Sequence, residues 1–434
     1  MKTEISICWL RRDLRIDDNA ALYHALKSNY PVLLLFIFDA NILKKLNDRQ
    51  DARVSFIHQT LEELNEKLKD YNSAIEIKHG TPEEVWADVL NTYQVKAIYA
   101  NHDYEPYARE RDDNLAEYLR SENIGFKTFK DQVIFEKNEI TKADGKPYTV
   151  FTPYFRQWQQ QLNSFYLKPY PVKKYLGNLL KRQYLPIPRL AALGFEPSVL
   201  KFPGKNFIGK LAAYEQKRDF PAEDATTRIG LHLRFGTISI RRAVTEALNQ
   251  KAEKWLSELA WREFYMMILW HFPNIVHQSF KPAYDKIRWI NNESDFEKWC
   301  SGNTGYALVD AGMRQLNQTG YMHNRVRMVT ASFLTKHLLI DWRWGEAYFA
   351  EKLLDYEQAS NVGGWQWACG SGNDAAPYFR VFNPELQATK FDPENKYINY
   401  WVPEIKQQKH VQPIVEHAFA RERALRVFKE ALQE

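Results

Sequence analysis

Two short segments in the second half of the chain place polar side chains where a helix would hold them on one face. Glu258, Trp261 and Arg262 are spaced by three and four positions, and helical residues at this spacing are neighbours on one surface. Residues 324–328 repeat the arrangement with an amide, arginines and a thioether. Such polar groups need partners when buried, so a pocket that hydrogen-bonds and stacks on a base is the better interpretation. An interface or a salt-bridged core is the alternative for either face taken alone.

A third segment, residues 226–230 (Thr-Thr-Arg-Ile-Gly), precedes a helical pattern. It offers two hydroxyls, backbone N–H groups and a guanidinium at an expected helix start, and such a site suits a phosphate or pyrophosphate. Taken alone, the same residues also fit an ordinary helix cap.

The stretch 361–384 is the most unusual in the chain, with four glycines and two tryptophans among uncharged polar residues. It does not have the single apolar stripe of an ordinary amphipathic helix. Glycine lets backbone approach a ligand closely and tryptophan offers a flat face with one donor, so we expect a pocket for planar aromatic molecules. A glycine-rich turn with buried tryptophans is the alternative.

Composition sets broad limits on the class of protein. A chain of 434 residues exceeds one compact core, so two domains are expected. The net charge of +5 permits nucleic-acid binding without predicting it. Cys8, Cys300 and Cys369 lie far apart, which argues against a disulfide framework, a structural zinc and a four-cysteine iron–sulfur cluster. We therefore expect no metal, a cytoplasmic location and no membrane span.

The elements that must position these residues differ between the two halves of the chain. Apolar runs of strand length at 5–10, 31–38, 74–77, 95–99 and 126–135 alternate with helical patterns. The first half therefore predicts an α/β domain with a doubly wound, mostly parallel sheet. Almost everything after residue 205 predicts helix. We expect an α/β domain over 1–130, an interdomain connection over 131–205 and an all-α domain over 206–434.

Ordered motifs along nearly the whole chain resemble the photolyase/cryptochrome family, and specifically bacterial class I cyclobutane pyrimidine dimer (CPD) DNA photolyases. They are residues 9–18, 214–221, 255–265, 320–328, 339–342, 363–367 and 383–384. The resemblance implies an N-terminal antenna domain and a helical domain that holds FAD in a U-shaped conformation. It also implies light-dependent repair of UV-damaged DNA, double- or single-stranded, by a monomer.

Carried over to this sequence, the family's FAD-binding positions fall on residues of the helical half. Asn361 would lie beside the flavin N5, where an amide adds no charge next to an anionic flavin. The other implied FAD-binding residues are Tyr214, Thr226, Thr227, Arg228, Ile229, Gly230, Trp255, Arg327, Asp355, Tyr356 and Glu357.

The resemblance also assigns electron-transfer and DNA positions. Trp365, Trp342 and Trp289 match the family's tryptophan triad, which passes an electron from the surface to the photoexcited flavin; core packing is their alternative role. The dimer pocket falls on Glu258, Trp261, Asn324, Met328 and Trp367, with Glu258 stabilising the dimer radical anion. The positions near DNA phosphates are Arg218, Arg262, Arg325, Arg380 and Gln387.

Several positions bear on the subfamily. Eukaryotic (6-4) photolyases have a histidine in the helix after Asn324, where this chain has Met328, and cryptochrome-DASH proteins carry tyrosine at Trp367. Sensory plant cryptochromes tend to have Asp at Asn361, so the residue favours repair. A blue-light photoreceptor with little repair activity is the alternative, and a flavoprotein or DNA-binding module with purely structural tryptophans is a third.

Two departures from the class I pattern concern the cofactors. Glu357 and Val362 stand where Asp and Asn are frequent, which leaves the tuning of the flavin open. Enzymes that use methenyltetrahydrofolate have Asn-Glu where this chain has Tyr107 and Ala108. The segment 105–112 is more similar to deazaflavin users, so we expect a deazaflavin, another flavin or no antenna chromophore.

Overall fold

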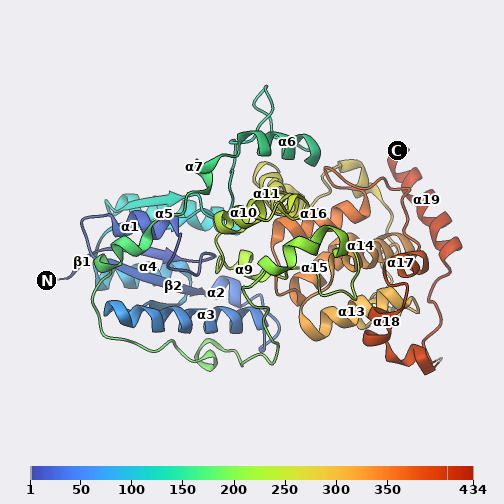
Figure 1. Ribbon diagram of the computed structural model, residues 1–434, viewed down its shortest axis with the longest axis horizontal. Coiled ribbons are helices and arrows are strands. Elements are labelled where there is room, and N and C mark those ends of the chain that lie inside the picture. Colours follow the sequence, from blue (N-terminus) through green and yellow to red (C-terminus); the bar gives the residue numbers. More distant parts are fainter. Residues whose placement is uncertain (1, 408, 434) are drawn as a thin grey trace. The chain divides into compact units, whose positions relative to one another are not determined.

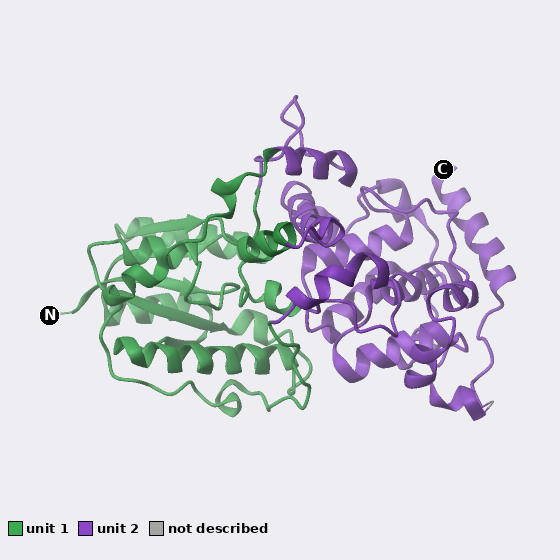
Figure 2. Ribbon diagram, in the orientation of Figure 1, with its two compact units in different colours: residues 1–136, 161–205, 229–249 green, residues 137–160, 206–228, 250–434 purple. Residues whose placement is uncertain are grey.

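A computed structural model describes residues 2–407 and 409–433. The chain forms two compact units, each assembled from several segments (Figure 2). Unit 1 comprises residues 1–136, 161–205 and 229–249, and unit 2 comprises residues 137–160, 206–228 and 250–434. The predicted connection at 131–205 is thus shared between the two units. The two units are defined by which residues pack together. The domain limits inferred from the sequence stay a prediction.

Unit 1 is built on a five-stranded parallel sheet, which confirms the predicted α/β fold (Figure 1). The strand order is β3-β2-β1-β4-β5. The strands are β1 (Glu4–Leu10), β2 (Val32–Asp39), β3 (Glu76–Gly80), β4 (Gln94–Asn101) and β5 (Gly125–Phe129). Because β1 lies at the centre with the chain crossing to either side of it, the carboxyl ends of β1 and β4 form the switch point where open α/β sheets bind ligands.

The helices of unit 1 lie between these strands in the sequence or follow the last of them. They are α1 (Ala20–Leu26), α2 (Ala40–Leu43), α3 (Ala52–Leu68), α4 (Pro82–Thr92), α5 (Pro106–Ser121), α7 (Ser164–Leu167), α9 (Gly230–Arg234) and α10 (Ile240–Asn249), with short 3₁₀ turns η1 (Lys69–Tyr71), η2 (Val172–Asn178) and η3 (Leu190–Leu193). α4 begins with a capping box. Thr81 accepts from the backbone of Glu84 while Glu84 accepts from the backbone of Thr81, and Pro82 occupies the first turn.

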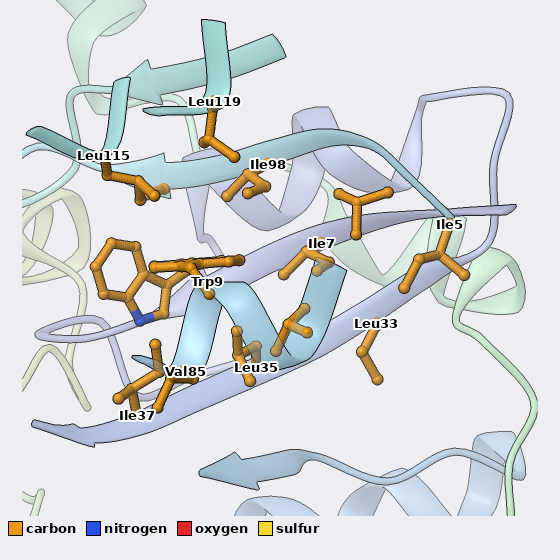
Figure 3. Close-up of a cluster of buried hydrophobic side chains, with 14 residues drawn as sticks. Ile5, Ile7, Trp9, Leu33, Leu35, Ile37, Val85, Ile98, Leu115 and Leu119 are labelled. Carbon is orange, nitrogen blue, oxygen red and sulfur yellow. The ribbon is translucent and has the colours of Figure 1, made fainter. Parts of the chain in front are cut away.

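One face of the sheet carries the core shown in Figure 3. Ile5, Ile7 and Trp9 of β1 alternate along the strand and therefore point to the same side. Trp86 of α4 meets Trp9 edge to face at 5.3 Å. The intervening residues of β1 are buried as well, as expected for a parallel sheet covered on both faces.

The last strand is shorter than predicted, because residues 130–135 leave the sheet. Asp131 is 2% exposed, and its carboxylate accepts from Arg15 at 2.5 Å and from Arg241 at 2.7 Å. It also accepts from the backbone N–H of Ala20 at 3.2 Å. Capture of this carboxylate by two arginines and a helix start stabilises a loop where apolar periodicity alone indicated strand.

Unit 2 is helical throughout (Figure 1). Its helices are α6 (Phe151–Gln161), α8 (Tyr214–Lys217), α11 (Glu253–His271), α12 (Glu293–Ser301), α13 (Ala307–Thr319), α14 (Asn324–Ser332), α15 (Trp342–Lys352), α16 (Gln358–Cys369), α17 (Pro384–Phe391), α18 (Lys396–Trp401) and α19 (His417–Gln433). A π-helical turn, η7 (Phe333–His337), continues α14, and 3₁₀ turns are η4 (Ile208–Ala213), η5 (Pro273–Val276), η6 (Pro282–Lys286) and η8 (Pro403–Gln407). No helix in the described ranges is long and apolar enough to cross a membrane.

The glycine-rich stretch forms α16, which packs against α11, α14 and α15. It is a helix without one apolar stripe, because most of its surface is buried. A Cβ at Gly363 would lie 2.2 Å from the Tyr265 ring of α11, and one at Gly345 of α15 would lie 2.1 Å from the Trp365 ring. Absence of these two side chains therefore permits the close packing of α16 on both neighbours.

Replacing Gly363 with alanine should destabilise the protein by about 1–3 kcal/mol, because the new methyl overlaps the Tyr265 ring. Gly364→Ala is the matched control: the same helix has open space there, and alanine should stabilise by about 0.5–1 kcal/mol. Urea unfolding followed by circular dichroism measures both free energies. Equal stability of the two variants would contradict the packing argument.

Candidate functional site

The two polar faces inferred from the sequence are joined by a chain of charged contacts. Glu258 of α11 is bonded to Arg218 at the end of α8. Asp219, the next residue, lies 3.8 Å from the Arg218 guanidinium and accepts from Arg325 of α14 at 2.8 Å. Arg218 and Arg325 thus share one carboxylate, and their network holds the Glu258 and Asn324 ends of the two faces in register.

The α14 face continues through sulfur contacts. The Met328 sulfur lies 3.9 Å from the Asn324 amide and 3.9 Å from the Arg325 guanidinium. Arg325 also lies over the Phe391 ring, with its central carbon 4.2 Å from the ring centre. Asn324 is exposed and Met328 is half-buried, so this face is open to a ligand.

Trp261 is half-buried against other aromatic rings. The Phe151 ring of α6 stacks on its indole with ring centres 3.8 Å apart and an interplanar angle of 10°. The backbone N–H of Phe151 donates to Asp374 at 2.9 Å, which ties α6 to the loop after α16. Trp261 and Trp367 are both half-buried, so each retains surface on which a planar group can stack.

The segment 226–228 forms a hydroxyl and guanidinium cradle. Thr227 accepts from the indole N–H of Trp255 at 3.3 Å, and Thr226 shares a hydrogen bond of 3.1 Å with the Tyr321 hydroxyl. Arg228 adopts a left-handed φ of 53° and lies over the Tyr321 ring at 5.1 Å. Exposed cation, hydroxyls and an irregular backbone turn suit a pyrophosphate, so the cradle fits the phosphate part of FAD.

The remaining predicted FAD residues of unit 2 extend this cradle. Arg327 of α14 forms two contacts of 3.1 Å with the Asp355 carboxylate and lies over the Tyr321 ring at 5.7 Å. Tyr214 is half-buried, and burial, followed by the charge of Glu258, raises the pKa of its phenol. Tyr214 therefore remains a neutral hydrogen-bonding group beside the Arg218 and Glu258 pair.

Asn361 is held by a half-buried acid, Glu346, that sequence reasoning missed. Its amide donates to the Glu346 carboxylate at 2.9 Å and to the Glu346 backbone carbonyl at 3.0 Å. The Tyr356 hydroxyl lies 3.5 Å from the same carboxylate. Burial raises the pKa of Glu346, which favours the neutral acid. Nothing in the spacing of the sequence indicated that Glu346 of α15 would meet Asn361 of α16.

Arg262, assigned by resemblance to the DNA phosphates, makes a contact inside the protein. It donates to Glu357 at 3.2 Å, and the two side chains are only 12% and 6% exposed. This pair neutralises the Glu357 carboxylate.

The positions assigned to DNA differ in exposure. Arg380 is exposed, whereas Gln387 of α17 is half-buried, with a side-chain oxygen that meets no partner among the described residues. The Arg380 carbonyl accepts from Lys336 at 2.8 Å, and burial lowers the pKa of this lysine to about 8. Lys336 therefore anchors the loop that carries Arg380.

Ile229 and Gly230 belong to unit 1 by their packing. Ile229 is 2% exposed, and Gly230 begins α9 as the sequence predicts for a helix start. The two residues follow Arg228 directly, so the predicted phosphate segment continues from one unit into the next along the chain.

The three tryptophans assigned to the triad differ in how deeply their side chains are buried. Trp365 is 2% exposed and Trp342 is 1% exposed, with the Arg343 guanidinium 4.7 Å from the Trp342 ring. Trp289 is half-buried and meets the Phe428 ring at 6.0 Å. This graded burial is compatible with both electron transfer and packing.

Other residues that sequence reasoning missed are aromatic or acidic partners of the predicted ones. Tyr321 links the cradle at Thr226 to Arg327, and its place inside the motif 320–328 is the one signal that marked it. Asp219 joins two arginines and stands in the motif 214–221. Phe151 has no such signal, because it comes from a segment interpreted as a surface connection.

Comparison with known proteins identifies the family. Residues 6–174 match the DNA photolyase family model, and residues 255–411 match the model for the FAD binding domain of DNA photolyase. A Halobacterium salinarum deoxyribodipyrimidine photo-lyase is 35% identical over 98% of this chain and 99% of its own length. A bacterial class III photolyase from Agrobacterium tumefaciens superposes with a TM-score of 0.89 at 31% identity, covering 100% of this chain and 99% of the other.

A second solved structure adds a cofactor. An archaeal photolyase from Sulfolobus tokodaii, solved with two FAD molecules, is 34% identical, has a TM-score of 0.85 and covers 99% of this chain and 100% of the other. The chain therefore belongs to the photolyase/cryptochrome family. Within that family it is a DNA photolyase, a carbon–carbon lyase of light-dependent DNA repair, with an FAD-binding helical unit.

Glu346→Gln should change how stability depends on pH. Because burial raises the pKa of Glu346, the folded chain binds this proton more tightly than the unfolded chain, and the stabilisation present below the ordinary value of 4.5 is lost as pH rises through the raised value. The glutamine side chain of the variant still offers Asn361 an oxygen and has no proton to lose. The variant should gain stability relative to the wild-type protein as pH rises above about 4.5, the ordinary pKa of the carboxyl group.

Denaturant unfolding at several pH values measures this difference. Glu351→Gln, an exposed carboxylate at the end of the same helix, is the control and should show no such trend. A difference between Glu346→Gln and wild type that does not vary with pH would contradict the assignment.

Proposed function

We propose that this photolyase splits cyclobutane pyrimidine dimers in DNA after flipping the dimer out of the helix. The observation that carries the proposal is the network from Glu258 through Arg218 and Asp219 to Arg325, which puts the α11 and α14 faces into one site. A flipped dimer needs stacking surfaces and hydrogen-bond partners together. Trp261 and Trp367 supply the first, and Glu258 and Asn324 supply the second.

FAD is the cofactor, and when it is bound and reduced it supplies the light-driven electron that opens the cyclobutane ring. Thr226, Thr227 and Arg228 would bind its phosphates, with Tyr214 and Trp255 beside them. Asn361, oriented by Glu346, would face the flavin N5. Arg327 with Asp355, and Arg262 with Glu357, would each present a neutral pair to the isoalloxazine. The protein thus binds and orients, while the chemistry belongs to the cofactor.

In the dimer pocket each side chain has a separate role. Glu258 hydrogen-bonds the pyrimidine carbonyls and stabilises the negative charge that develops on the dimer. Arg218 holds the Glu258 carboxylate in place. The Met328 thioether and the two indoles exclude water from the reacting bond, because these groups are large and apolar.

The electron that first reduces FAD would pass from Trp289 at the surface to Trp342, then to Trp365, and from Trp365 to the flavin. Trp365 lies on the same helix as Asn361, one turn further along α16. The half-buried Trp289 is the end of this route at the protein surface.

A second chromophore binds unit 1 at the carboxyl ends of the strands. Tyr107 of α5 donates to Asp39, the last residue of β2, at 2.7 Å, and Lys45 lies 5.4 Å from the Tyr107 ring. The guanidinium groups of Arg11 and Arg111 each lie 4.7 Å from the centre of the Trp9 ring. These aromatic and cationic groups favour a flavin or deazaflavin over methenyltetrahydrofolate, in line with the two FAD molecules of the Sulfolobus tokodaii structure.

Damaged DNA, duplex or single-stranded, is the partner, and the enzyme acts as a cytoplasmic monomer. Arg380 and Arg325 contact the phosphates, which determine affinity and its salt dependence.

The experiment that tests the function uses chemically reduced, FAD-loaded protein with duplexes that carry a cyclobutane dimer or a (6-4) product. Under blue or near-ultraviolet light, only the cyclobutane substrate should be restored, and neither should change in the dark. Glu258→Ala should lower the repair yield more than it lowers binding. Repair of the (6-4) product, or bound and photoreducible flavin without repair of either substrate, would overturn the proposal.

Arg380→Ala should weaken binding to damaged and undamaged duplex alike and reduce the slope of log affinity against log salt by about 0.9, the effect of one lost phosphate contact. Arg421→Ala, which removes an equally exposed arginine from α19, is the matched control and should leave the slope unchanged. Titrations by fluorescence anisotropy at several salt concentrations provide both slopes. A loss confined to damaged DNA would place Arg380 in the lesion pocket instead.

A further inference from the structure

Trp365 has a second aromatic neighbour that leads away from the predicted triad. The Trp299 ring of α12 meets Trp365 edge to face with ring centres 6.0 Å apart and an angle of 69°. Trp299 is 0% exposed, and its indole N–H donates to the Thr330 carbonyl at 3.2 Å. Phe349 packs against both indoles, at 5.0 Å from Trp365 and 6.0 Å from Trp299, and fixes their relative position.

One further ring, that of Tyr348, connects Trp299 to the protein surface. Tyr348 of α15 meets Trp299 edge to face at 5.7 Å and is half-buried. Its hydroxyl donates to the Asn317 side-chain oxygen at 2.7 Å and lies 3.2 Å from the Cys300 carbonyl. Asn317 is exposed, so this phenol is one polar group away from water.

We propose that Trp299 and Tyr348 form a second route that refills Trp365 with electrons, alongside the route through Trp342. The proposal rests on the proposed role of Trp365 as electron donor to photoexcited flavin. Indole and phenol are the side chains that transfer single electrons readily, and here they meet ring to ring from Trp365 to Tyr348. Packing alone would be served by phenylalanine or leucine at Trp299 and at Tyr348.

The electrons and protons that pass along this route are replaced by an external thiol. One electron leaves Trp365 for the flavin, one passes from Trp299 to Trp365, and one passes from Tyr348 to Trp299. Tyr348 releases its phenolic proton past Asn317 to water and becomes a neutral radical. An external thiol then returns one electron and one proton to Tyr348 and is itself oxidised to a thiyl radical, which pairs with a second one as a disulfide.

The end of the route is Tyr348 and not Trp344. Trp344 contacts this cluster through the Phe296 ring, 5.2 Å away, and Phe296 in turn stacks on Trp299 at 5.8 Å. Phenylalanine is far harder to oxidise than tyrosine or tryptophan, so the direct contact from Trp299 to Tyr348 is the competent one. Trp344 therefore serves as an internal control.

The test measures photoreduction of oxidised, FAD-loaded protein with a thiol present, in variants that close one or both routes. Trp342→Phe should keep part of the wild-type rate, and adding Tyr348→Phe or Trp299→Phe should lower it to the rate of Trp365→Phe. Adding Trp344→Phe should cause no further loss. Flavin absorption and melting temperature show whether each variant folds. If Trp299→Phe is unstable because Trp299 is buried, Tyr348→Phe, which keeps an aromatic ring, provides the test.

A spectroscopic readout identifies the radical independently of rate. After illumination and freezing, Trp342→Phe should give an electron paramagnetic resonance signal that narrows when tyrosine with a deuterated ring is incorporated and disappears with Tyr348→Phe. A Trp342→Phe rate already equal to that of Trp365→Phe, or residual photoreduction that survives loss of Tyr348, would overturn the proposal. Repair by chemically reduced variants needs no such route, so it tests the proposed function separately.

Discussion

The close packing of α16 between α11 and α15 is the constraint on which the functional half of this protein depends. α16 carries Asn361, Trp365 and Trp367. Under the proposed function, this one helix would reach the flavin, an electron route and the lesion pocket. It can do so because Gly363 and Gly345 remove the side chains that would separate the helices. Protein interiors are too densely packed to absorb a methyl group at such distances, so the positions of the α16 side chains follow from two glycines.

Charge neutralisation is the second organising feature. The acids around the predicted isoalloxazine are all compensated: Asp355 by Arg327, Glu357 by Arg262, and Glu346 by a raised pKa. An unpaired carboxylate there would be costly to bury and would repel a negatively charged flavin. The same device serves packing in unit 1, where Asp131 is held by two arginines. Paired charges therefore do not by themselves indicate a functional site. The pairs in unit 2 indicate one only because they lie near Asn361 and the cradle.

The fold was largely predictable from the sequence, and the site only in part. Alternation of apolar runs with helical patterns predicted the parallel sheet, because this signal is local. The strand expected through residue 135 was wrong beyond Phe129, since long-range partners of Asp131 decide that segment. Glu258 and Asn324 were each placed on a helix face by spacing. Their connection through Asp219, and the contact of Glu346 with Asn361, depend on helices distant in sequence, which periodicity does not report.

The tryptophan distribution shows how one composition serves two demands. Ten of the 13 tryptophans lie after residue 250, where the helices need large side chains to fill the spaces between them. Trp299 and Trp365 fill such a space, and Phe349 seals it. A phenylalanine could have served for packing, but indoles that touch also let charge move between them. In the proposed routes, the core that stabilises unit 2 would also conduct electrons, and their path would depend on which rings meet and which of them reach water.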